Sequence, residues 1–505
     1  MQPALAFLLL AAPALAQDFN GDGYGDLAVG APKEDVGAYS DAGAVTVFYG
    51  GANGLKNTGV QQWTQDSTGI ANFCENGDQF GVALAHGDFD GNGYDDLAIG
   101  ANLEDLAATN CGAVHVLYGG PNGLASLNNE FWHQDSSGVL DSCESWDQFG
   151  AELSAGDFNG DGYADLAIGV IYEDLGRTPV TDCGAVAVLY GSPGGLSSTN
   201  NQLWSQDSGT VPDLNEASDY FGWTLASGDF NADGRDDLAV GTPYEKLYTS
   251  DDAGAVIVLN GSASGLTSMN SKSWNQASLS GEIESNDCFG WALATGDFDG
   301  NGADDLAVGS PTESLEAFGT IAEVGTVQVL YGAPGTGLSN ANGQSWTQSA
   351  TFQDGSEAHD WFGYALAAAD FNNDGRADLA IGVPFEDLDF SSQGAVNVLN
   401  GGPVGLSTSG AKLLHQGNLG FADPAEGGDN FGFALRAGRF LGGSYASLAV
   451  GVPHEDAGTV VDCGAVQAIY GSGSGLGAAG TQFYHQGSSG VPDNNETFDG
   501  FGSSL

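Results

Sequence analysis

The chain has 505 residues with 81 glycines and 15 prolines, and 66 acidic against 10 basic residues give a formal net charge of −56. Glycine enrichment without proline or a three-residue period excludes a collagen triple helix, and the 41% hydrophobic content excludes a disordered chain. The charge excludes nucleic acids and anionic membranes as partners, because such a surface repels polyanions and attracts cations.

The first sixteen residues differ from the rest of the chain. Residues 1–16 form a short apolar run that ends in Ala14-Leu15-Ala16, a small-residue pattern typical of a signal peptide cleaved before Gln17. No later segment approaches eighteen uninterrupted apolar residues, so we expect no membrane span. We therefore expect an exported protein, either secreted into the extracellular space or held at the cell surface, with residues 17–505 as a single domain.

A Phe-Gly pair marks a repeat that recurs through the whole chain. In the repeats an apolar run such as LAVG or LAIG follows this pair, and then come a Gly-Ala-Val-type run and a segment that ends in Trp-x-Gln or a variant. Four short β-branched or aromatic runs separated by Gly, Asn, Asp and Ser predict four strands per repeat, and no window shows a helical period. The pairs recur at intervals of 68 to 73 residues and begin at Phe80, Phe149, Phe221, Phe289, Phe362, Phe431 and Phe501.

Seven such units predict an all-β fold, a seven-bladed β-propeller of four-stranded antiparallel blades. One four-stranded sheet cannot bury both of its faces alone, and radial stacking suits repeats that have no distinct capping units. Residues 501–505 correspond to the start of an inner strand, whereas Gln17 lies in the loop that follows such a strand. We therefore expect the N- and C-terminal strands to pair within one blade and close the ring.

The loop after each Phe-Gly strand carries oxygen ligands at positions 1, 3, 5 and 9 and glycine at position 6. Alternating oxygens suit a hard cation that takes six to eight oxygen ligands, which is calcium, and the glycine permits the sharp turn. Flanking strands and the missing glutamate at position 12 exclude an EF-hand. Six loops have the complete set and predict up to six calcium sites: Asp18, Asn20, Asp22 and Asp26; Asp88, Asp90, Asn92 and Asp96; Asp157, Asn159, Asp161 and Asp165; Asp229, Asn231, Asp233 and Asp237; Asp297, Asp299, Asn301 and Asp305; Asp370, Asn372, Asp374 and Asp378.

The seventh loop lacks these ligands. Its matching positions hold Arg439, Leu441, Gly443 and Ser447, which cannot form a cage of oxygens. We hypothesise that Arg439 replaces the metal with its own positive charge. The alternative for the six complete loops, Asp-rich turns without metal, is disfavoured by their common register.

The pattern of the second loop and its flanking strands resembles a known repeat. The segment from Phe80-Gly81 through Asp88, Asp90, Asn92 and Asp96 to Ala101 is similar to the FG-GAP repeat of integrin α-subunit propellers and of secreted bacterial FG-GAP proteins. The resemblance covers essentially the whole mature chain. It implies calcium in hairpins on the lower face and ligand binding by loops of the opposite, upper face. No inserted adhesion domain interrupts the repeats, so the resemblance implies the propeller module and not integrin-like signalling.

Four of the six cysteines lie in loops expected on the same upper rim. We predict the disulfides Cys74–Cys111 and Cys143–Cys183, which are consistent with an oxidising compartment. Cys288 and Cys463 lie in the same two types of loop but in blades that are not neighbours. We expect both to be unpaired, or at most to link two molecules.

Further acidic and aromatic residues are candidates for recognition. A Glu recurs sixteen residues after the first position of every loop, and it persists as Glu455 in the repeat without metal ligands, which favours an architectural role. Trp223 and Trp291 follow Phe-Gly pairs and are expected to pack between blades. Trp146 and Trp361 precede such pairs in upper loops, where they are candidates for stacking on sugars or anchoring a protein.

Together these patterns predict an exported propeller, stabilised by calcium, that acts as an adhesion or ligand-recognition module without enzymatic activity. Its partner is expected to be an extracellular protein or a glycan. One alternative is a carbohydrate-binding, lectin-like propeller. A less favoured alternative is a polysaccharide-cleaving enzyme that uses paired carboxylates, because the repeat offers no solitary acid pair. His133, His415 and His485 share one repeat position and give no catalytic set.

Overall fold

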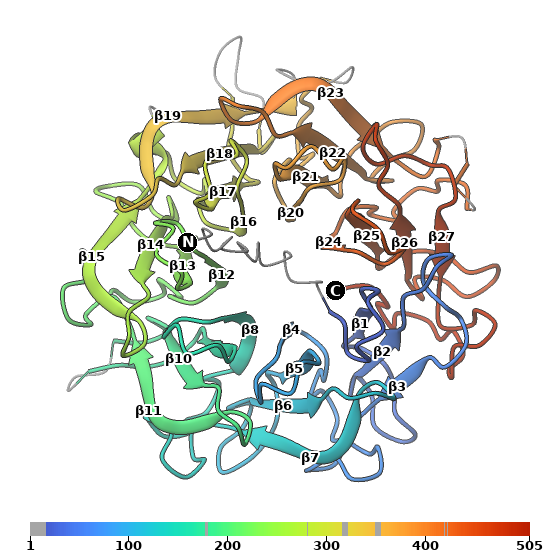
Figure 1. The fold of residues 1–505 in the computed structure, drawn as a ribbon, viewed down its shortest axis with the longest axis horizontal. Coiled ribbons are helices and arrows are strands. Elements are labelled where there is room, and N and C mark those ends of the chain that lie inside the picture. Colours follow the sequence, from blue (N-terminus) through green and yellow to red (C-terminus); the bar gives the residue numbers. More distant parts are fainter. Residues whose placement is uncertain are drawn as a thin grey trace, which may run out of the picture.

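The computed structural model describes residues 17–505 except 177–179, 280, 316–321, 349–354, 419 and 422. Within this part of the chain, strands form seven sheets arranged around a central axis (Figure 1). Six sheets have four strands and one has three, and consecutive strands of a sheet pair antiparallel. The predicted all-β seven-bladed propeller is confirmed. The predicted signal peptide, residues 1–16, lies outside the described residues.

The strands follow chain order from the axis outward in every blade (Figure 1). The first three blades contain β1 (Leu27–Ala31), β2 (Ala44–Phe48) and β3 (Gln61–Trp63); β4 (Leu84–Gly87), β5 (Asp96–Ala101), β6 (Ala113–Tyr118) and β7 (Ala125–Trp132); β8 (Phe149–Gly156), β9 (Asp165–Val170), β10 (Ala185–Tyr190) and β11 (Ser197–Trp204). The next two contain β12 (Thr224–Gly228), β13 (Asp237–Thr242), β14 (Ala255–Asn260) and β15 (Thr267–Trp274), followed by the 3-10 helix η1 (Gln276–Leu279); and β16 (Ala292–Gly296), β17 (Asp305–Ser310), β18 (Thr326–Tyr331) and β19 (Ser339–Trp346). The last two contain β20 (Leu366–Ala369), β21 (Asp378–Val383), β22 (Ala395–Asn400) and β23 (Ser407–Leu414); and β24 (Ala434–Gly438), β25 (Ser447–Val452), β26 (Ala465–Ile469) and β27 (Gln482–Tyr484).

The missing inner strand of the first blade comes from the other end of the chain. The Gly30 N–H in β1 donates to the Ser504 carbonyl at 3.0 Å, and the Gly502 N–H donates to the Gly30 carbonyl at 3.0 Å. Residues 501–505 therefore complete the sheet beside β1 by antiparallel pairing. The predicted closure of the ring by its two ends is confirmed.

The core lies between neighbouring blades. The second and third strands of the blades are buried along almost their whole length, because both faces of each sheet are covered by the adjacent sheets. Val45 and Val47 of β2, for example, share one apolar cluster with Leu97 and Ile99 of β5. This arrangement explains why the LAVG-type and Gly-Ala-Val-type runs are apolar at every position, whereas a strand with one exposed face would alternate apolar and polar residues.

A ring of side-chain hydrogen bonds joins each blade to the next. In every repeat the Nε2 of a Gln after the outer strand donates to the recurring Glu of the following repeat. The pair Gln416–Glu455, at 2.5 Å, forms in the repeat that lacks metal ligands, so the predicted architectural role of this Glu is confirmed. The ring consists of Gln65–Glu104, Gln134–Glu173, Gln206–Glu245, Gln276–Glu313, Gln348–Glu386, Gln416–Glu455 and Gln486–Glu34.

Candidate metal centres and ligand face

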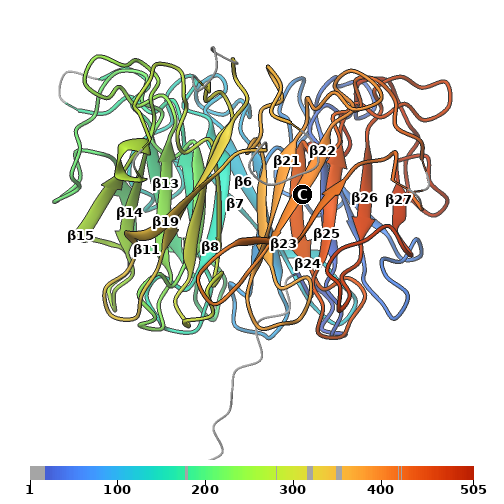
Figure 2. The same cartoon turned by 90° about the horizontal axis from the view of Figure 1, so that it is seen from above.

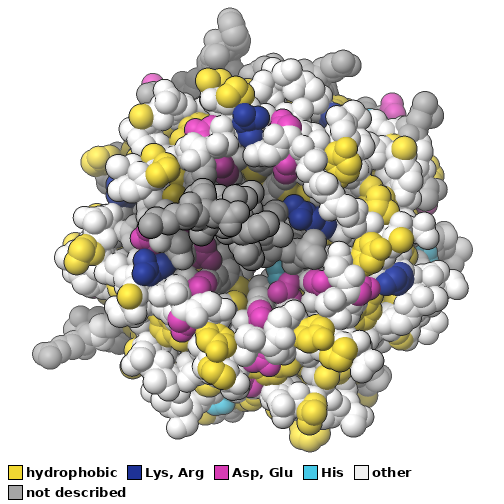
Figure 3. All heavy atoms as spheres, in the orientation of Figure 1, with side chains coloured by type: hydrophobic (Ala, Val, Ile, Leu, Met, Phe, Trp, Pro, Cys, Tyr) yellow, Lys and Arg dark blue, Asp and Glu magenta, His cyan; other side chains and the backbone are white. Residues whose placement is uncertain are grey.

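Five of the six acidic loops form short hairpins between the first and second strands of their blades, at one end of the propeller. The loop of Asp18 to Asp26 leads into β1 at the same end, where the Asp18 carbonyl accepts the Asp95 N–H of the second hairpin. We call this end the lower face and the opposite end, which carries the longer loops seen in Figure 2, the upper face. Seen from the lower face, Asp and Glu side chains lie around the centre, interspersed with Lys and Arg side chains, whereas hydrophobic side chains lie scattered farther out (Figure 3).

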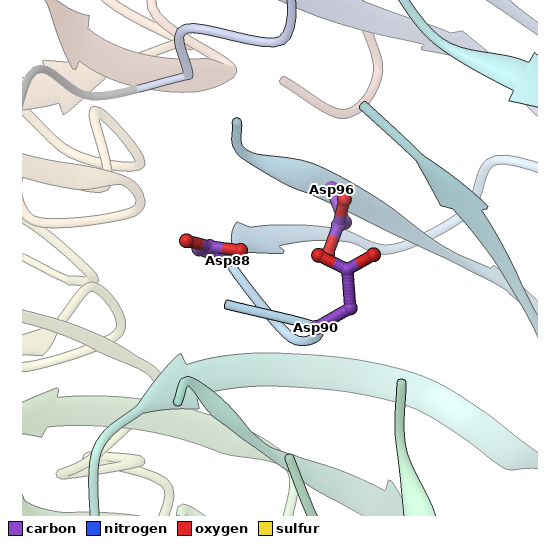
Figure 4. A group of neighbouring side chains, drawn as sticks. All are labelled: Asp88, Asp90 and Asp96. Carbon is purple, nitrogen blue, oxygen red and sulfur yellow. The ribbon is translucent and has the colours of Figure 1, made fainter. Parts of the chain in front are cut away.

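In the second hairpin, between β4 and β5, three carboxylates converge. Oxygens of Asp88, Asp90 and Asp96 lie within 4.8 Å of one another (Figure 4). The matching oxygens of Asp297, Asp299 and Asp305, between β16 and β17, are equally close. Two oxygens on opposite sides of a calcium ion, each about 2.3–2.6 Å from it, have nearly this separation. The donor set and its spacing fit calcium.

Backbone hydrogen bonds hold the second hairpin in this shape. Asp88 accepts the Asn92 N–H at 2.9 Å with Oδ1 and the Gly93 N–H at 2.8 Å with Oδ2. Gly93 has a φ of 88°, a conformation that a residue with a Cβ rarely adopts. The glycine at position 6 is therefore required by the turn, as the sequence predicted.

The aspartate at position 9 is the buried anchor of each hairpin. Asp96 is fully buried and accepts the N–H groups of Phe89 and Gly119, both at 2.8 Å. Burial, together with the negative charges of Asp90 and Asp88, raises the pKa of Asp96 to about 8. The same causes raise the pKa of the equivalent Asp26, Asp165 and Asp305 to about 8 and of Asp237 and Asp378 to about 7. A bound cation would reverse this effect, because it stabilises the ionised form.

The other four hairpins carry Asn at position 3. The Nδ2 atoms of Asn20, Asn231 and Asn372 lie 3.1–3.5 Å from the carboxylate at position 9. In the third hairpin, Oδ1 of Asn159 is buried and has no hydrogen-bond partner within the described residues. Rotating the side-chain amide of Asn20, Asn231 or Asn372 by 180° would replace the nitrogen with the oxygen at the centre of the loop, where a cation needs an oxygen ligand.

The seventh loop keeps the hairpin without the acids. Leu441 packs against the apolar core between the last and first blades, and the Arg439 carbonyl accepts the N–H groups of Gly25 and Gly442 at 3.0 and 3.2 Å. Ser447, at the place of the buried aspartate, is almost fully buried. Arg439 forms no ion pair in the described part of the chain, so the replacement of metal by its charge remains a hypothesis.

The predicted disulfide pairing is wrong. The structure joins Cys111 to Cys143, with Cα atoms 5.6 Å apart, and leaves Cys74 and Cys183 unpaired and buried. The reason is the register of the repeats: the Phe149 N–H donates to the Cys111 carbonyl at 2.8 Å, so the loop before a Phe-Gly pair contacts the Gly-Ala-Val loop of the preceding repeat. The expected pairs Cys74–Cys111 and Cys143–Cys183 had placed both loops in the same repeat.

The remaining cysteines follow the same register. Cys288 and Cys463 are unpaired and buried, as expected from their positions in blades that are not neighbours. Cys463 faces the loop before Phe501, whose N–H donates to the Cys463 carbonyl at 3.3 Å. Because its thiol is buried, Cys463 is unsuited to linking two molecules.

Aromatic side chains form a continuous line over the upper face. Neighbouring rings have centroids 4.9–6.5 Å apart, within the range of favourable aromatic pairs, and all are half-buried. Trp223, Trp291 and Tyr364 hold the same place after successive Phe-Gly pairs and so connect blade to blade. We call this set the aromatic arc: Tyr172, Tyr220, Trp223, Tyr244, Trp291, Trp361, Tyr364, Phe385 and Phe433.

The structure separates the two tryptophans predicted to bind a ligand. Trp361 belongs to the aromatic arc, where its Nε1 donates to Glu323 Oε2 at 3.0 Å. Trp146 is 56% exposed and makes no ring contact within the described residues. Sequence reasoning missed Tyr172, Tyr244 and Phe385, although all three directly precede the recurring Glu.

Comparison with known proteins identifies the repeat. The FG-GAP repeat family matches residues 10–48, 80–117, 149–189, 221–259, 289–330 and 362–399. The chain is an FG-GAP repeat protein. The repeat that begins at Phe431 and has lost its acidic ligands lies outside the matched ranges.

Relatives of this FG-GAP propeller include proteins with different names. It is 30% identical to integrin alpha-PS2 of Drosophila melanogaster over 277 residues, 52% of this chain and 18% of the relative. It is 31% identical to integrin alpha-5 of Xenopus laevis over 235 residues, 46% of this chain and 20% of the relative. Phosphatidylinositol-glycan-specific phospholipase D of Bos taurus is 30% identical over 167 residues, 33% of this chain and 19% of the relative. The chain thus spans about a fifth of the length of these relatives.

Comparison with solved structures adds a weaker likeness. The exotype rhamnogalacturonan lyase YesX aligns with a TM-score of 0.36 and 11% identity, covering 80% of this chain and 64% of that one. A likeness at this TM-score supports no functional argument. Among the described residues, no helix is long and apolar enough to cross a membrane.

Proposed function

We propose that the protein is an exported, calcium-binding propeller that recognises an extracellular partner through its upper face. The observation that carries this proposal is the aromatic arc, a half-buried aromatic surface that continues from Tyr172 to Phe433. Aromatic side chains combine a large apolar area with little conformational entropy to lose, so they are frequent anchors of binding interfaces. The similarity to integrin α subunits supports an adhesion-type role.

Calcium has a structural role in this proposal. The six complete hairpins lie on the lower face, opposite the aromatic arc, and their ligands all come from one short loop each. A cation in each hairpin removes repulsion between carboxylates and fixes the hairpin. The upper loops then project from a rigid scaffold.

The asymmetry of the arc favours a protein partner over a set of equivalent sugar sites. The positions that hold Tyr172, Tyr244 and Phe385 in the third, fourth and sixth blades hold other residues elsewhere: Lys33 and Leu103 in the first two blades, Thr312 in the fifth and His454 in the seventh. A lectin-like propeller would reuse one pocket in every blade, whereas this surface is built on one side of the ring. We therefore propose recognition of an extracellular protein, without catalysis, and keep glycan binding as the second candidate because aromatic rings also stack on sugars.

The experiment is binding of residues 17–505 to an array of glycans and extracellular matrix proteins, in calcium and in chelator. Trp223→Ala and Trp291→Ala are expected to weaken capture of a protein at least tenfold. Leu127→Ala is the matched control, because Leu127 is 76% exposed on the outer strand β7 and lies outside the arc. Thermal melting of each variant confirms that it is folded.

Each outcome of the array decides something. Capture of a defined sugar that depends on the same tryptophans would show that the partner is a glycan and not a protein. Capture that is insensitive to both tryptophans would reject the aromatic arc as the binding surface. Absence of capture by folded, calcium-loaded protein would reject the recognition function.

A further inference from the structure

A cavity of about 590 Å³ lies on the axis of the propeller. Its wall consists of residues 503–505 and of the inner strands β4, β8, β12, β16, β20 and β24, which surround the central opening in Figure 1. Trp291 and Tyr364 also line it, so the cavity adjoins the aromatic arc of the upper face. Its volume falls in the range of about 300–1,000 Å³ that is typical of ligand pockets.

Small or apolar side chains form most of this wall, and three residues break the pattern. Among the described residues that line the cavity, His86, Glu152 and Arg436 are the only acidic, basic or histidine side chains. Each belongs to a different blade and holds a position where the matching repeats carry a small residue. At the position of Arg436, for example, these repeats carry Ala85, Ser154, Ala226, Ala294 and Ala367. The propeller fold itself therefore does not require an arginine at this position.

Arg436 extends from the seventh blade into the cavity. Burial lowers the pKa of Arg436 to about 10, while the charges of Asp95 in the second blade and Glu152 in the third act to raise it, although neither blade is a neighbour of the seventh. With the Gln17 amide oriented so that both of its atoms have partners, its oxygen accepts the Arg436 Nε–H at 3.0 Å. Within the described part of the chain Arg436 forms no ion pair, and its two terminal nitrogens have no hydrogen-bond partner. Their N–H donors are therefore available to a ligand.

The acids near Arg436 do not neutralise it. Asp95 is engaged elsewhere, because its Oδ2 accepts the Asp18 N–H at 3.0 Å and lies 3.5 Å from Nδ1 of His86. Burial raises the pKa of Glu152 to about 8, although the charge of Arg436 opposes this, so Glu152 is mostly protonated at neutral pH. Arg436 stays charged there, since its pKa lies well above 7. A charge removed from water without a partner costs free energy, so the cavity favours an anionic ligand.

We propose that the axial cavity binds a carboxylate group, which pairs with the guanidinium of Arg436 while the apolar part of the ligand packs against the alanine-rich wall and Trp291. The planar guanidinium matches the two oxygens of a carboxylate with parallel hydrogen bonds. The carboxylate belongs either to a small organic acid or to the C-terminus of a peptide, and the test distinguishes these two sources. This site is additional to the partner of the aromatic arc and does not depend on it.

The test is equilibrium dialysis of residues 17–505 with radioactive benzoate and with the labelled tripeptide Gly-Gly-Phe. We expect saturable binding of one carboxylate probe per chain, and at least tenfold weaker binding of benzamide or of the tripeptide amide, which have nearly the same shape without the charge. Arg436→Ala should weaken binding at least tenfold, and it should fold because four matching repeats carry Ala at this position. Arg439→Ala is the matched control, because it removes the same charge from the same blade outside the cavity.

Each outcome supports or overturns the carboxylate site. Tighter binding of the tripeptide than of benzoate would assign the site to a peptide C-terminus, and the reverse order would assign it to a small acid. Absence of binding of both probes, equal binding of the uncharged analogues, or binding that Arg436→Ala does not change would overturn the proposal. Thermal melting shows whether each variant is folded. Arg436→Lys is a second variant that keeps the charge but loses the planar fork, and it should weaken binding less than Arg436→Ala does.

Discussion

Substitution of Asp96 by Asn is expected to have opposite effects on stability with and without calcium. Asp96 is buried, and the remaining acids of its hairpin lie within 4.8 Å. Without a cation, the folded chain must protonate this carboxyl or bear an uncompensated buried charge. With calcium bound, the ionised carboxylate is a ligand, and a neutral amide binds the ion more weakly.

The magnitude follows from the pKa of Asp96, which burial raises from 3.8 to about 8. A carboxyl whose pKa is raised in the folded chain stabilises that chain fully below pH 3.8, the pKa of the unfolded state, and this stability is lost as the pH rises from there through 8. The loss grows by about 1.4 kcal/mol for each pH unit above 3.8, so at pH 7 it amounts to about 4 kcal/mol. Asn cannot ionise, so Asp96→Asn is expected to raise the free energy of unfolding by up to about 4 kcal/mol in chelator at pH 7.

The assay is urea unfolding followed by tryptophan fluorescence, at pH 5 and pH 7, in chelator and in calcium. In chelator the wild type should be more stable at pH 5, and Asp96→Asn should reduce that difference. In calcium the variant should be less stable than the wild type. Ser447→Ala is the control, because Ser447 holds the same position in the loop without acids. If Asp96→Asn destabilised the protein equally in both media, the aspartate would serve packing and not metal binding.

Two further predictions concern the joints of the ring. Reduction of the disulfide Cys111–Cys143, whose cysteines are 32 residues apart, should lower the free energy of unfolding by about 4 kcal/mol. In thermal melts, reductant should destabilise the wild type and the control Cys74→Ala, but it should not affect the double variant Cys111→Ser with Cys143→Ser. Phe501→Ala should cost about 3–5 kcal/mol, because Phe501 is fully buried and lies edge-on to Phe48. Phe498→Ala, at a side chain 62% exposed, should cost less than about 0.5 kcal/mol in the same unfolding experiment. Equal losses of unfolding free energy for Phe501→Ala and Phe498→Ala would refute the claim that residues 501–505 hold the ring closed.

The sequence was sufficient for the parts of the molecule that each repeat determines by itself. Strand runs, the acidic hairpins and the glycine at position 6 are local patterns, and the structure forms them where they were expected. The pairing of Cys111 with Cys143 was not local, because it depends on how one repeat docks against the next. Sequence spacing assigned both loops to one blade, while the backbone contact between Cys111 and Phe149 shows that they come from successive repeats.

The upper face shows the same limit. Tyr244 and Trp223 are 21 positions apart in the sequence and belong to different loops, yet their rings are 5.1 Å apart. This pair lies within one blade, and the aromatic arc becomes continuous because rings of successive blades also meet. The centroids of Trp223 and Trp291, for example, are 5.5 Å apart, a contact that no single repeat displays. Trp146, judged by its loop alone, was grouped with Trp361, but within the described part of the chain only Trp361 of these two has aromatic neighbours.

The closure of the ring has a consequence for biosynthesis. The first blade obtains its inner strand from residues 501–505, and Gln486 must reach Glu34, 452 residues earlier, to complete the ring of hydrogen bonds. A ribosome therefore releases the early blades long before the segment that completes them, and β1 keeps an unpaired edge during translation. Such an edge is a template for aggregation. Residues 501–505 thus act as a latch, and the ring can close only after they have been synthesised.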